Sequence, residues 1–452
     1  MEKEERKKPQ KDFRFSVFNP LSWKRSEYIA VETKSQEKSF VVTDGSGNAV
    51  DHQVLGRRKG TVLILCYLEN IPPLSFSQLI VTPSAAKPIV PAQWKITNRL
   101  VETPRYRVRF DSRGQISSLH DKSLRRELVA KGARVNHFQA YKDVPKQWDA
   151  WDIDADYTNK PIDLFRFERL RIVEEGPLRA TLRLELKSDN GSRLTQDIHF
   201  YHKSPRVDFR TSVSWKEKQT LLKVAFPLNV KTHAATYEIQ FGALRRTTKP
   251  VDSHQKAKFE VPAQQWADLS EQKFGVSLLN DCKYGYDASD TTMRLTLLRS
   301  PHYPHALDPL RLNDVRLTDQ GEHVFTYALY PHSSDWRGGE TLQRARELNQ
   351  PLVVVPGTAV SLPSLVSISS PGIVIDSIKK AEDSDEVIIR LHEAYGHSLK
   401  TTMTFGIRAD AASECDLLEQ DLTTLKIAKS KLSLKFSPFE IKTLKVKFRA
   451  RQ

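Results

Sequence analysis

The densest group of side chains that could do chemistry lies at residues 148–154. This segment reads WDAWDID, so two indole rings and three carboxylates fall within one short stretch. Indole faces can stack on the C–H faces of sugar rings, and carboxylates accept hydrogen bonds from sugar hydroxyl groups. Carbohydrate contact is therefore one interpretation of Trp148, Asp149, Trp151 and Asp152. The alternative, which the composition alone favours, is that the tryptophans fill a core and the acids cap turns.

A second polar group follows the short apolar segment 276–279. It reads NDCKYGYD and combines carboxylate, ammonium and phenol groups directly after an apolar strand pattern. Polar residues at the end of a strand are typical of a binding loop, because loops carry function on a rigid scaffold. An ordinary hairpin turn is the alternative, and composition does not decide between the two.

Several familiar catalytic motifs are absent from the sequence or have the wrong spacing. Residues 392–397 read HEAYGH, but the histidines are five apart, whereas the zinc-protease motif needs four to place both on one helical face. The segment is also rich in strand formers and is broken by Gly396, so we expect a loop at the edge of a sheet. The sequence has no Gly-x-Ser-x-Gly elbow, and the glycine-rich segment 45–48 lacks the Lys-Ser/Thr of a phosphate loop.

The net charge of +15, from 70 Lys and Arg against 55 Asp and Glu, raises the question of nucleic acid. The basic residues are scattered among acids, as in Lys216-Glu217-Lys218, rather than aligned on one face, so we expect a solvated surface and no nucleic-acid partner. No apolar run is long enough for a membrane helix, and the N-terminus has no secretory core. The three cysteines are far apart and form no CxxC pair. We therefore expect reduced thiols and a cytoplasmic protein without membrane contact.

Short strand-like segments follow one another with almost no helical pattern between them. Alternating residues at 106–110 and 115–119 predict one hairpin, and Asn190-Gly191 predicts the turn of another. One helix is predicted at 339–349, before Pro351. The fold class is therefore all-β: a large antiparallel sandwich flanked by two smaller β-sandwich domains. The predicted parts are a charged tail (1–11), a small β-domain (12–90) ending in a proline-rich linker (84–91), the large sandwich (91–335), a helical connector (336–353) and a C-terminal sandwich (354–452).

Several motifs, in order, resemble glycoside hydrolase family 38 α-mannosidases of the branch with cytosolic, vacuolar and many bacterial members. The resemblance covers the chain from about residue 15 to its end, and many ordered motifs carry it. They are FNPLSW (18–23), WDAWDI (148–153), FEVP (259–262), WADLSE (266–271), FGV (274–276), NDCKYGY (280–286), LLRSP (297–301) and YPH (330–332). At Pro304-His305 relatives often have Pro-Asp, and the segment 306–318 is longer than usual.

The resemblance implies that these sandwiches, the larger of them a mutarotase-like supersandwich, normally follow an N-terminal catalytic β/α barrel. That barrel carries an aspartate nucleophile, an acid and a zinc ion held by two His and two Asp. No residue here matches those positions, so we assign no catalytic and no metal-binding residue, and we expect zinc only in the missing barrel. The large sandwich lends side chains to the rim of the sugar site. By resemblance, the substrate-rim candidates are Trp148, Asp149, Trp151, Asp152 and Arg299, with Asp281, Lys283 and Tyr284 as weaker ones. The alternative is that these residues hold the interface between barrel and sandwich.

The first hypothesis for function is the non-catalytic β-half of an α-mannosidase, acting on α-mannosides with a separately encoded catalytic-barrel chain and inactive alone. The second is a stand-alone carbohydrate-binding protein, or a vestigial one that has lost its barrel. The third is a truncated product of a complete enzyme. An aryl α-mannoside assay with a partner barrel, and titration with mannose oligosaccharides, separate the first two.

Overall fold

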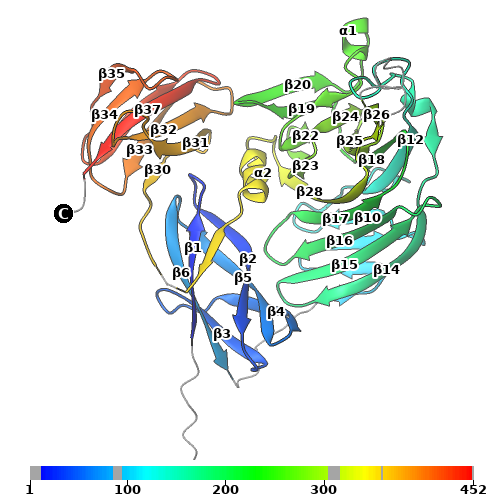
Figure 1. Cartoon of the computed structure of the whole chain (residues 1–452), viewed down its shortest axis with the longest axis horizontal. Helices are drawn as coiled ribbons and strands as arrows, with labels where there is room; N and C mark the ends of the chain where they lie inside the picture. Colours follow the sequence, from blue (N-terminus) through cyan, green and yellow to red (C-terminus); the bar gives the residue numbers. More distant parts are fainter. Residues whose placement is uncertain (1–11, 85–93, 304–315, 358–359, 450–452) are drawn as a thin grey trace, which may run out of the picture. The chain divides into compact units, whose positions relative to one another are not determined.

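The computed structural model describes residues 12–84, 94–303, 316–357 and 360–449. Among these residues strands dominate, with two α-helices and one short 3-10 helix (Figure 1), which confirms the all-β fold class. The predicted charged tail, most of the predicted linker and Pro304-His305 lie outside the described residues. None of the helices in the described ranges is long and apolar enough to cross a membrane.

The described chain divides into two compact units. One comprises residues 92–240 and 244–349, and the other comprises 1–91, 241–243 and 350–452. The first unit, the large sandwich, contains the candidate site and is described first.

Three antiparallel sheets build most of the large sandwich. The nine-stranded sheet has the order β14 (Arg166–Glu175), β15 (Arg179–Lys187), β16 (Arg193–Tyr201), β17 (Val207–Trp215), β28 (Gly321–Ser333), β23 (Phe274–Asn280), β22 (Trp266–Glu271), β19 (Ala234–Ile239), β20 (Gly242–Thr247). The six-stranded sheet has the order β13 (Pro161–Ile162), β12 (His137–Lys142), β18 (Thr220–Pro227), β25 (Thr292–Arg299), β24 (Gly285–Ser289), β21 (Val261–Pro262). The five-stranded sheet has the order β11 (Arg126–Glu127), β10 (Ile116–Asp121), β9 (Tyr106–Phe110), β8 (Leu100–Glu102), β7 (Lys95–Ile96).

Short elements complete the large sandwich. They are the 3-10 helix η1 (Tyr157–Asn159), α1 (Ser253–Lys256), the strand pair β26 (His302–Tyr303) and β27 (Arg316–Leu317), and α2 (Thr341–Asn349). Helix α2 is the helix predicted at 339–349 and begins two residues later. Its start follows Glu340, whose φ of 57° is not helical.

A ring cluster joins the nine-stranded and six-stranded sheets in the core. Phe209 of β17 stacks on Tyr327 of β28 at 5.2 Å between ring centroids, and Phe226 of β18 meets both rings edge-on. All three side chains are fully buried, and the Tyr327 hydroxyl donates a hydrogen bond to Asn136 Oδ1 at 2.6 Å. The sheets therefore pack face to face through interlocking rings, as the alternating sequence pattern predicts.

The strand register gathers three loops at one end of the six-stranded sheet. Lys142 at the end of β12 pairs with Thr220 at the start of β18. Leu221 pairs in turn with Arg299, the last residue of β25. The segments after β12, before β18 and after β25 must therefore leave the sheet at the same end, and this end carries the candidate site.

The other unit holds two pairs of smaller sheets, each around its own core. One pair is β29 (Val353–Pro356), β1 (Phe13–Asn19), β6 (Ser75–Ser84), β3 (Ser39–Asp44) and β2 (Arg25–Lys34), β5 (Thr61–Ile71), β4 (Asp51–Arg58). The other pair is β30 (Val366–Ile368), β33 (Leu399–Phe405), β36 (Lys431–Phe436) and β31 (Ile373–Lys380), β32 (Val387–Glu393), β37 (Ile441–Phe448), β34 (Ala409–Cys415), β35 (Asp421–Leu425). Strand β29 pairs with β1, so the chain returns to its first sheet after α2.

The HEAYGH segment has a structural role in this unit. His392 and Glu393 end β32, and Gly396 turns the chain with a φ of 75°. The fully buried Glu393 carboxylate accepts hydrogen bonds at 2.8–3.1 Å from four backbone N–H groups, those of Tyr395, Gly396, His397 and Phe439. The glutamate therefore ties the turn to a second loop.

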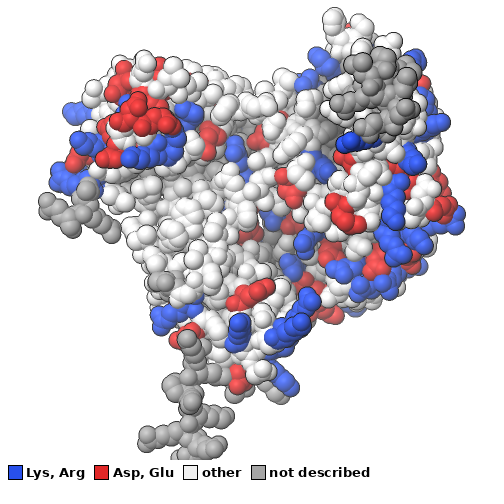
Figure 2. Space-filling model, viewed as in Figure 1, with Lys and Arg blue, Asp and Glu red and all other residues white. Residues whose placement is uncertain are grey.

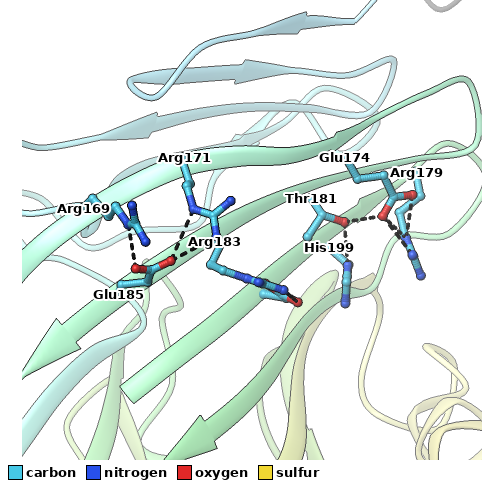
Figure 3. Close-up of polar contacts among 9 residues, drawn as sticks. Arg169, Arg171, Glu174, Arg179, Thr181, Arg183, Glu185 and His199 are labelled. Atoms are coloured by element: carbon cyan, nitrogen blue, oxygen red, sulfur yellow. Dashed lines mark hydrogen bonds and ion pairs between the residues drawn. The ribbon is translucent and has the colours of Figure 1, made fainter. Parts of the chain in front are cut away.

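The outer face of β14–β16 is a ladder of polar side chains, shown in Figure 3. Figure 2 shows acidic and basic side chains mixed over the same strands. Within the ladder, Thr181 donates a hydrogen bond to Glu174 and lies 2.8 Å from Nδ1 of His199, so the hydroxyl accepts the Nδ1 proton. Burial, and after it the positive charge of the nearby Arg179, lower the pKa of His199 to about 4. His199 is therefore neutral at physiological pH.

We expect Glu393→Ala to lower the free energy of unfolding by on the order of 3–5 kcal/mol, because it removes a buried carboxylate and leaves its four backbone N–H donors without their acceptor. Urea unfolding followed by far-UV circular dichroism measures this change. Asp385→Ala, which removes a fully solvated carboxylate, is the control and should change stability by less than about 0.5 kcal/mol. Equal unfolding midpoints for the two variants would contradict the assigned role.

A pH dependence follows from His199. Between about pH 6.5 and 4 the unfolded chain binds a proton at this histidine and the folded chain does not, so stability falls as the pH falls. The total loss should be on the order of 3 kcal/mol at pH 4. Urea unfolding of the wild type and of His199→Gln at several pH values should give curves that diverge over this range. His254→Gln, at an exposed histidine of α1, should follow the wild type, and parallel curves for His199→Gln would disprove the assignment.

Candidate functional site

Three aromatic side chains form an exposed group at the loop end of the six-stranded sheet. The ring centroids of Trp148 and Trp151 lie 6.2 Å apart, and those of Trp151 and Tyr303 lie 6.4 Å apart. Their exposed fractions are 54%, 63% and 50%, respectively. Neither tryptophan fills the core, so the interpretation of these two residues as core side chains is wrong. We call Trp148, Trp151 and Tyr303 the aromatic rim.

Arg299 connects the loop of the aromatic rim to the sheet. Its Nε and Nη2 donate to the two carboxylate oxygens of Asp143 at 2.6 and 3.2 Å, and Nη2 also donates to the backbone oxygen of Asp152. Asp143 is buried, and burial raises the pKa of its carboxyl group although the Arg299 hydrogen bonds oppose this shift. The bidentate pair fixes the guanidinium plane and directs its remaining nitrogen away from Asp143.

Asp149 lies beneath the rim rather than on it. Its side chain is buried, and Oδ2 lies 3.3 Å from Nδ1 of His302. Gln219, from the loop before β18, brings its amide nitrogen within 3.4 Å of the same ring nitrogen. Asp149 is therefore placed to hold His302 and the neighbouring Tyr303. Asp152, by contrast, accepts a hydrogen bond from the N–H of Ile153, and its side chain is exposed.

The loop that carries the tryptophans is held by local and distant contacts. Trp148 has a φ of 59°, and its backbone oxygen accepts hydrogen bonds from the N–H groups of Trp151 and Asp152. Beyond the turn, the Tyr157 hydroxyl of η1 donates to Glu260 Oε1 at 2.5 Å. The loop is thus a tight turn with a buried anchor.

The anchor belongs to a buried ion cluster on the outer face of the six-stranded sheet. Lys223 of β18 is fully buried and pairs with Glu260 and with Asp287 Oδ1, the latter at 2.6 Å. Asp287 also pairs with Arg294 at 2.6 Å. Burial raises the pKa of Glu260, and Lys223 opposes that shift. Two cations and two carboxylates therefore balance each other under the loop.

The second predicted cluster has other partners. Asp281 Oδ2 accepts a hydrogen bond from the N–H of Thr326 on β28, and the Lys283 ammonium lies 4.7 Å from the centre of the Phe325 ring. Tyr284 is 49% exposed. Asp281 and Lys283 thus contact strand β28, whereas Tyr284 presents an exposed ring.

Sequence reasoning missed three residues of the site: Asp143, His302 and Tyr303. Tyr303 and His302 follow LLRSP directly, so an aromatic residue next to a histidine after a strand was the signal that could have found them. Nothing around Asp143 marks it, because its partner Arg299 is 156 residues away.

Stacking and hydrogen bonding are the chemistry that the arrangement supports. Exposed rings offer flat apolar faces, and Arg299 offers a donor held in place by Asp143. Among the described residues, no three His, Cys, Asp or Glu side chains gather in a way that could hold a metal ion.

Comparisons of the sequence with known proteins identify the family of this chain. The model of the glycosyl hydrolases family 38 C-terminal domain matches residues 101–307, and that of the family 38 C-terminal beta sandwich domain matches residues 372–444. The chain is 35% identical to "Alpha-mannosidase 2C1" of Homo sapiens over 95% of its own length, and 34% identical to "Alpha-mannosidase G" of Dictyostelium discoideum over 88%. It spans 39% and 37% of these relatives.

A solved structure shows the same fold. The crystal structure of an alpha-mannosidase from Enterococcus faecalis V583 matches 97% of this chain and 56% of its own chain, with a TM-score of 0.74 and 16% identity. The similarity expected from the sequence motifs is thus confirmed in sequence and in fold. The chain belongs to glycosyl hydrolase family 38 and corresponds to the C-terminal β-sandwich region of that family.

Proposed function

We propose that this chain supplies the sandwich-side wall of an α-mannoside site. The observation that carries the proposal is the aromatic rim next to an arginine that Asp143 holds in place. Sugar rings stack on exposed indole and phenol faces, and a fixed guanidinium donates to sugar hydroxyl groups. Support for mannoside as the sugar comes from the relatives, whose names are those of α-mannosidases.

The two buried carboxylates near the aromatic rim, Asp143 and Asp149, are not placed to act as the catalytic pair of a glycosidase. A retaining glycosidase uses two carboxyl groups about 5–5.5 Å apart, one as nucleophile and one as acid. Here Asp143 is engaged by Arg299, and Asp149 lies beneath the rim beside His302. We therefore propose that the bond-breaking groups and zinc belong to a β/α barrel supplied by another segment or chain, and that mannose-oligosaccharide breakdown needs both.

Sugar binding without a barrel is the second candidate. The aromatic rim is exposed in this chain by itself, and exposed aromatic residues beside polar groups are typical of interaction sites. We also propose a cytoplasmic protein with no nucleic-acid partner. Support comes from the three cysteines, none of which is in a disulfide, and from the mixed charges over β14–β17.

We expect isothermal titration calorimetry to show binding of a mannose oligosaccharide, and Trp151→Ala to weaken it about tenfold, because one stacking ring contributes roughly 1 kcal/mol or more. Arg299→Met should weaken binding further by releasing the loop. Tyr284→Ala removes an exposed ring of the second cluster, 49% exposed against 63% for Trp151, and is the matched control. Loss of affinity in Tyr284→Ala, with Trp151→Ala unchanged, would move the site to the second cluster.

The catalytic part of the proposal has its own test. The purified chain with added zinc should not release the aryl group from an aryl α-mannoside. Mixing the chain with a catalytic barrel encoded by a neighbouring reading frame should produce release of the aryl group. Arg299→Met should reduce that activity. Hydrolysis by the chain alone would refute the division of roles, whereas the binding experiment would still stand.

A further inference from the structure

A recess of the large sandwich has three basic side chains and one acidic side chain among the ten residues of its lining. It has a volume of about 290 Å³ and shares no lining residue with the aromatic rim. Its walls come from β19, β20, the segment around α1, and β24. We call it the basic cleft, and the side chains that matter are Tyr237, Arg245, Arg246, Gln255, Lys258 and Asp287.

Arg246 is the unusual residue of the cleft. Its side chain is partly buried on β20, and its buried Nε has no hydrogen-bond partner among the described residues. Native proteins satisfy almost all buried polar groups, so an unsatisfied buried guanidinium nitrogen in a residue that lines a cleft requires an explanation. A bound anion is the simplest, because guanidinium groups hydrogen-bond oxyanions in a planar, bidentate geometry.

The charges around Arg246 also favour an anion. Asp287 is the acidic residue of the cleft lining, and its carboxylate is already paired with Lys223 and Arg294, each at 2.6 Å. It therefore does not neutralise Arg246 or the two neighbouring exposed cations, Arg245 and Lys258. The basic cleft thus carries three positive charges that a ligand can balance.

Neutral donors add to this preference. Gln255 Oε1 accepts a hydrogen bond from the N–H of Val251 at 2.9 Å, which leaves the amide nitrogen of Gln255 as its donor end. Burial raises the pKa of Tyr237, so its hydroxyl keeps its proton. Donors from three segments around one recess suit a tetrahedral oxyanion, whose oxygens point in several directions, better than a flat carboxylate.

We propose that the basic cleft binds the phosphate group of a small phosphomonoester. A phosphate carries about 1.5–2 negative charges at pH 7, which matches the excess of cations. The volume exceeds that of a phosphate ion, so the cleft has room for an attached group the size of a sugar. This site shares no lining residue with the aromatic rim, and the proposal does not rest on the proposed α-mannoside function.

Titration calorimetry of the intact chain tests the proposal with three probes: inorganic phosphate, a hexose 6-phosphate and acetate. We expect the hexose phosphate to bind more tightly than inorganic phosphate, and acetate to bind more weakly than both. Arg246→Met should weaken phosphate binding about tenfold or more, since it removes a charge-assisted, bidentate donor. Lys258→Met, at an exposed residue, should weaken it by a smaller factor.

The control is Arg193→Met, which makes the same change of charge at an exposed position of β16 and should leave binding within about twofold. No heat from inorganic phosphate at tens of millimolar, or equal losses in Arg246→Met and Arg193→Met, would overturn the site. Inorganic phosphate binding as tightly as hexose phosphate would overturn the phosphomonoester as its ligand. Thermal unfolding of each variant shows whether it is folded.

Discussion

Strand β18 is buried on both faces, and much of the large sandwich follows from this constraint. One face places Phe226 in the core against the nine-stranded sheet. The other face contains Lys223, whose ammonium group is fully removed from water. A buried ammonium is costly unless it is paired, and Glu260 and Asp287 are its partners. The segments that carry those carboxylates and η1 must therefore cover this face of the sheet.

This cover links the core to the aromatic rim. The Tyr157 hydroxyl of η1 donates to Glu260, and the tryptophans lie a few residues before it in the same loop. At the other end of the loop, Asp143 leaves β12 and pairs with Arg299 from β25. The turn that exposes Trp148 and Trp151 is therefore fixed at both ends by partners in the six-stranded sheet or its cover. The indole rings therefore stay exposed because the turn behind them is fixed, which is the feature on which the proposed sugar contact rests.

The sequence predicted the fold class well because its signals are local. Alternating residues, Asn-Gly turns and the spacing of apolar residues at 339–349 depend only on near neighbours, and the sheets and α2 follow them. The order of the strands in a sheet does not depend on near neighbours alone. Strand β28 lies between β17 and β23 in the nine-stranded sheet, although it follows β23 in the chain. Such pairings depend on long-range packing, which no local pattern records.

The residues of the candidate site also fall into those that a local sequence pattern reveals and those that only distant contacts reveal. The pair of tryptophans was found because residues of one kind lie close together in the sequence. Asp143 was missed because its meaning comes from Arg299, and His302 because its contact with Asp149 spans 153 residues. For the same reason Glu393 resembled part of a metal motif, whereas its four N–H donors show a structural carboxylate.

The contacts of Arg299 and of the rim turn also bear on the proposal that this sandwich forms the wall of a site whose bond-breaking groups are supplied elsewhere. Arg299 belongs to a strand, and its guanidinium is held by a buried carboxylate, so its position does not depend on a ligand. The rim tryptophans belong to a turn, yet the turn is anchored by η1 and by the backbone of Asp152. A wall assembled by contacts that are complete within one folding unit is preorganised before any sugar or barrel arrives. Binding then loses less conformational entropy, and affinity depends on the contacts themselves.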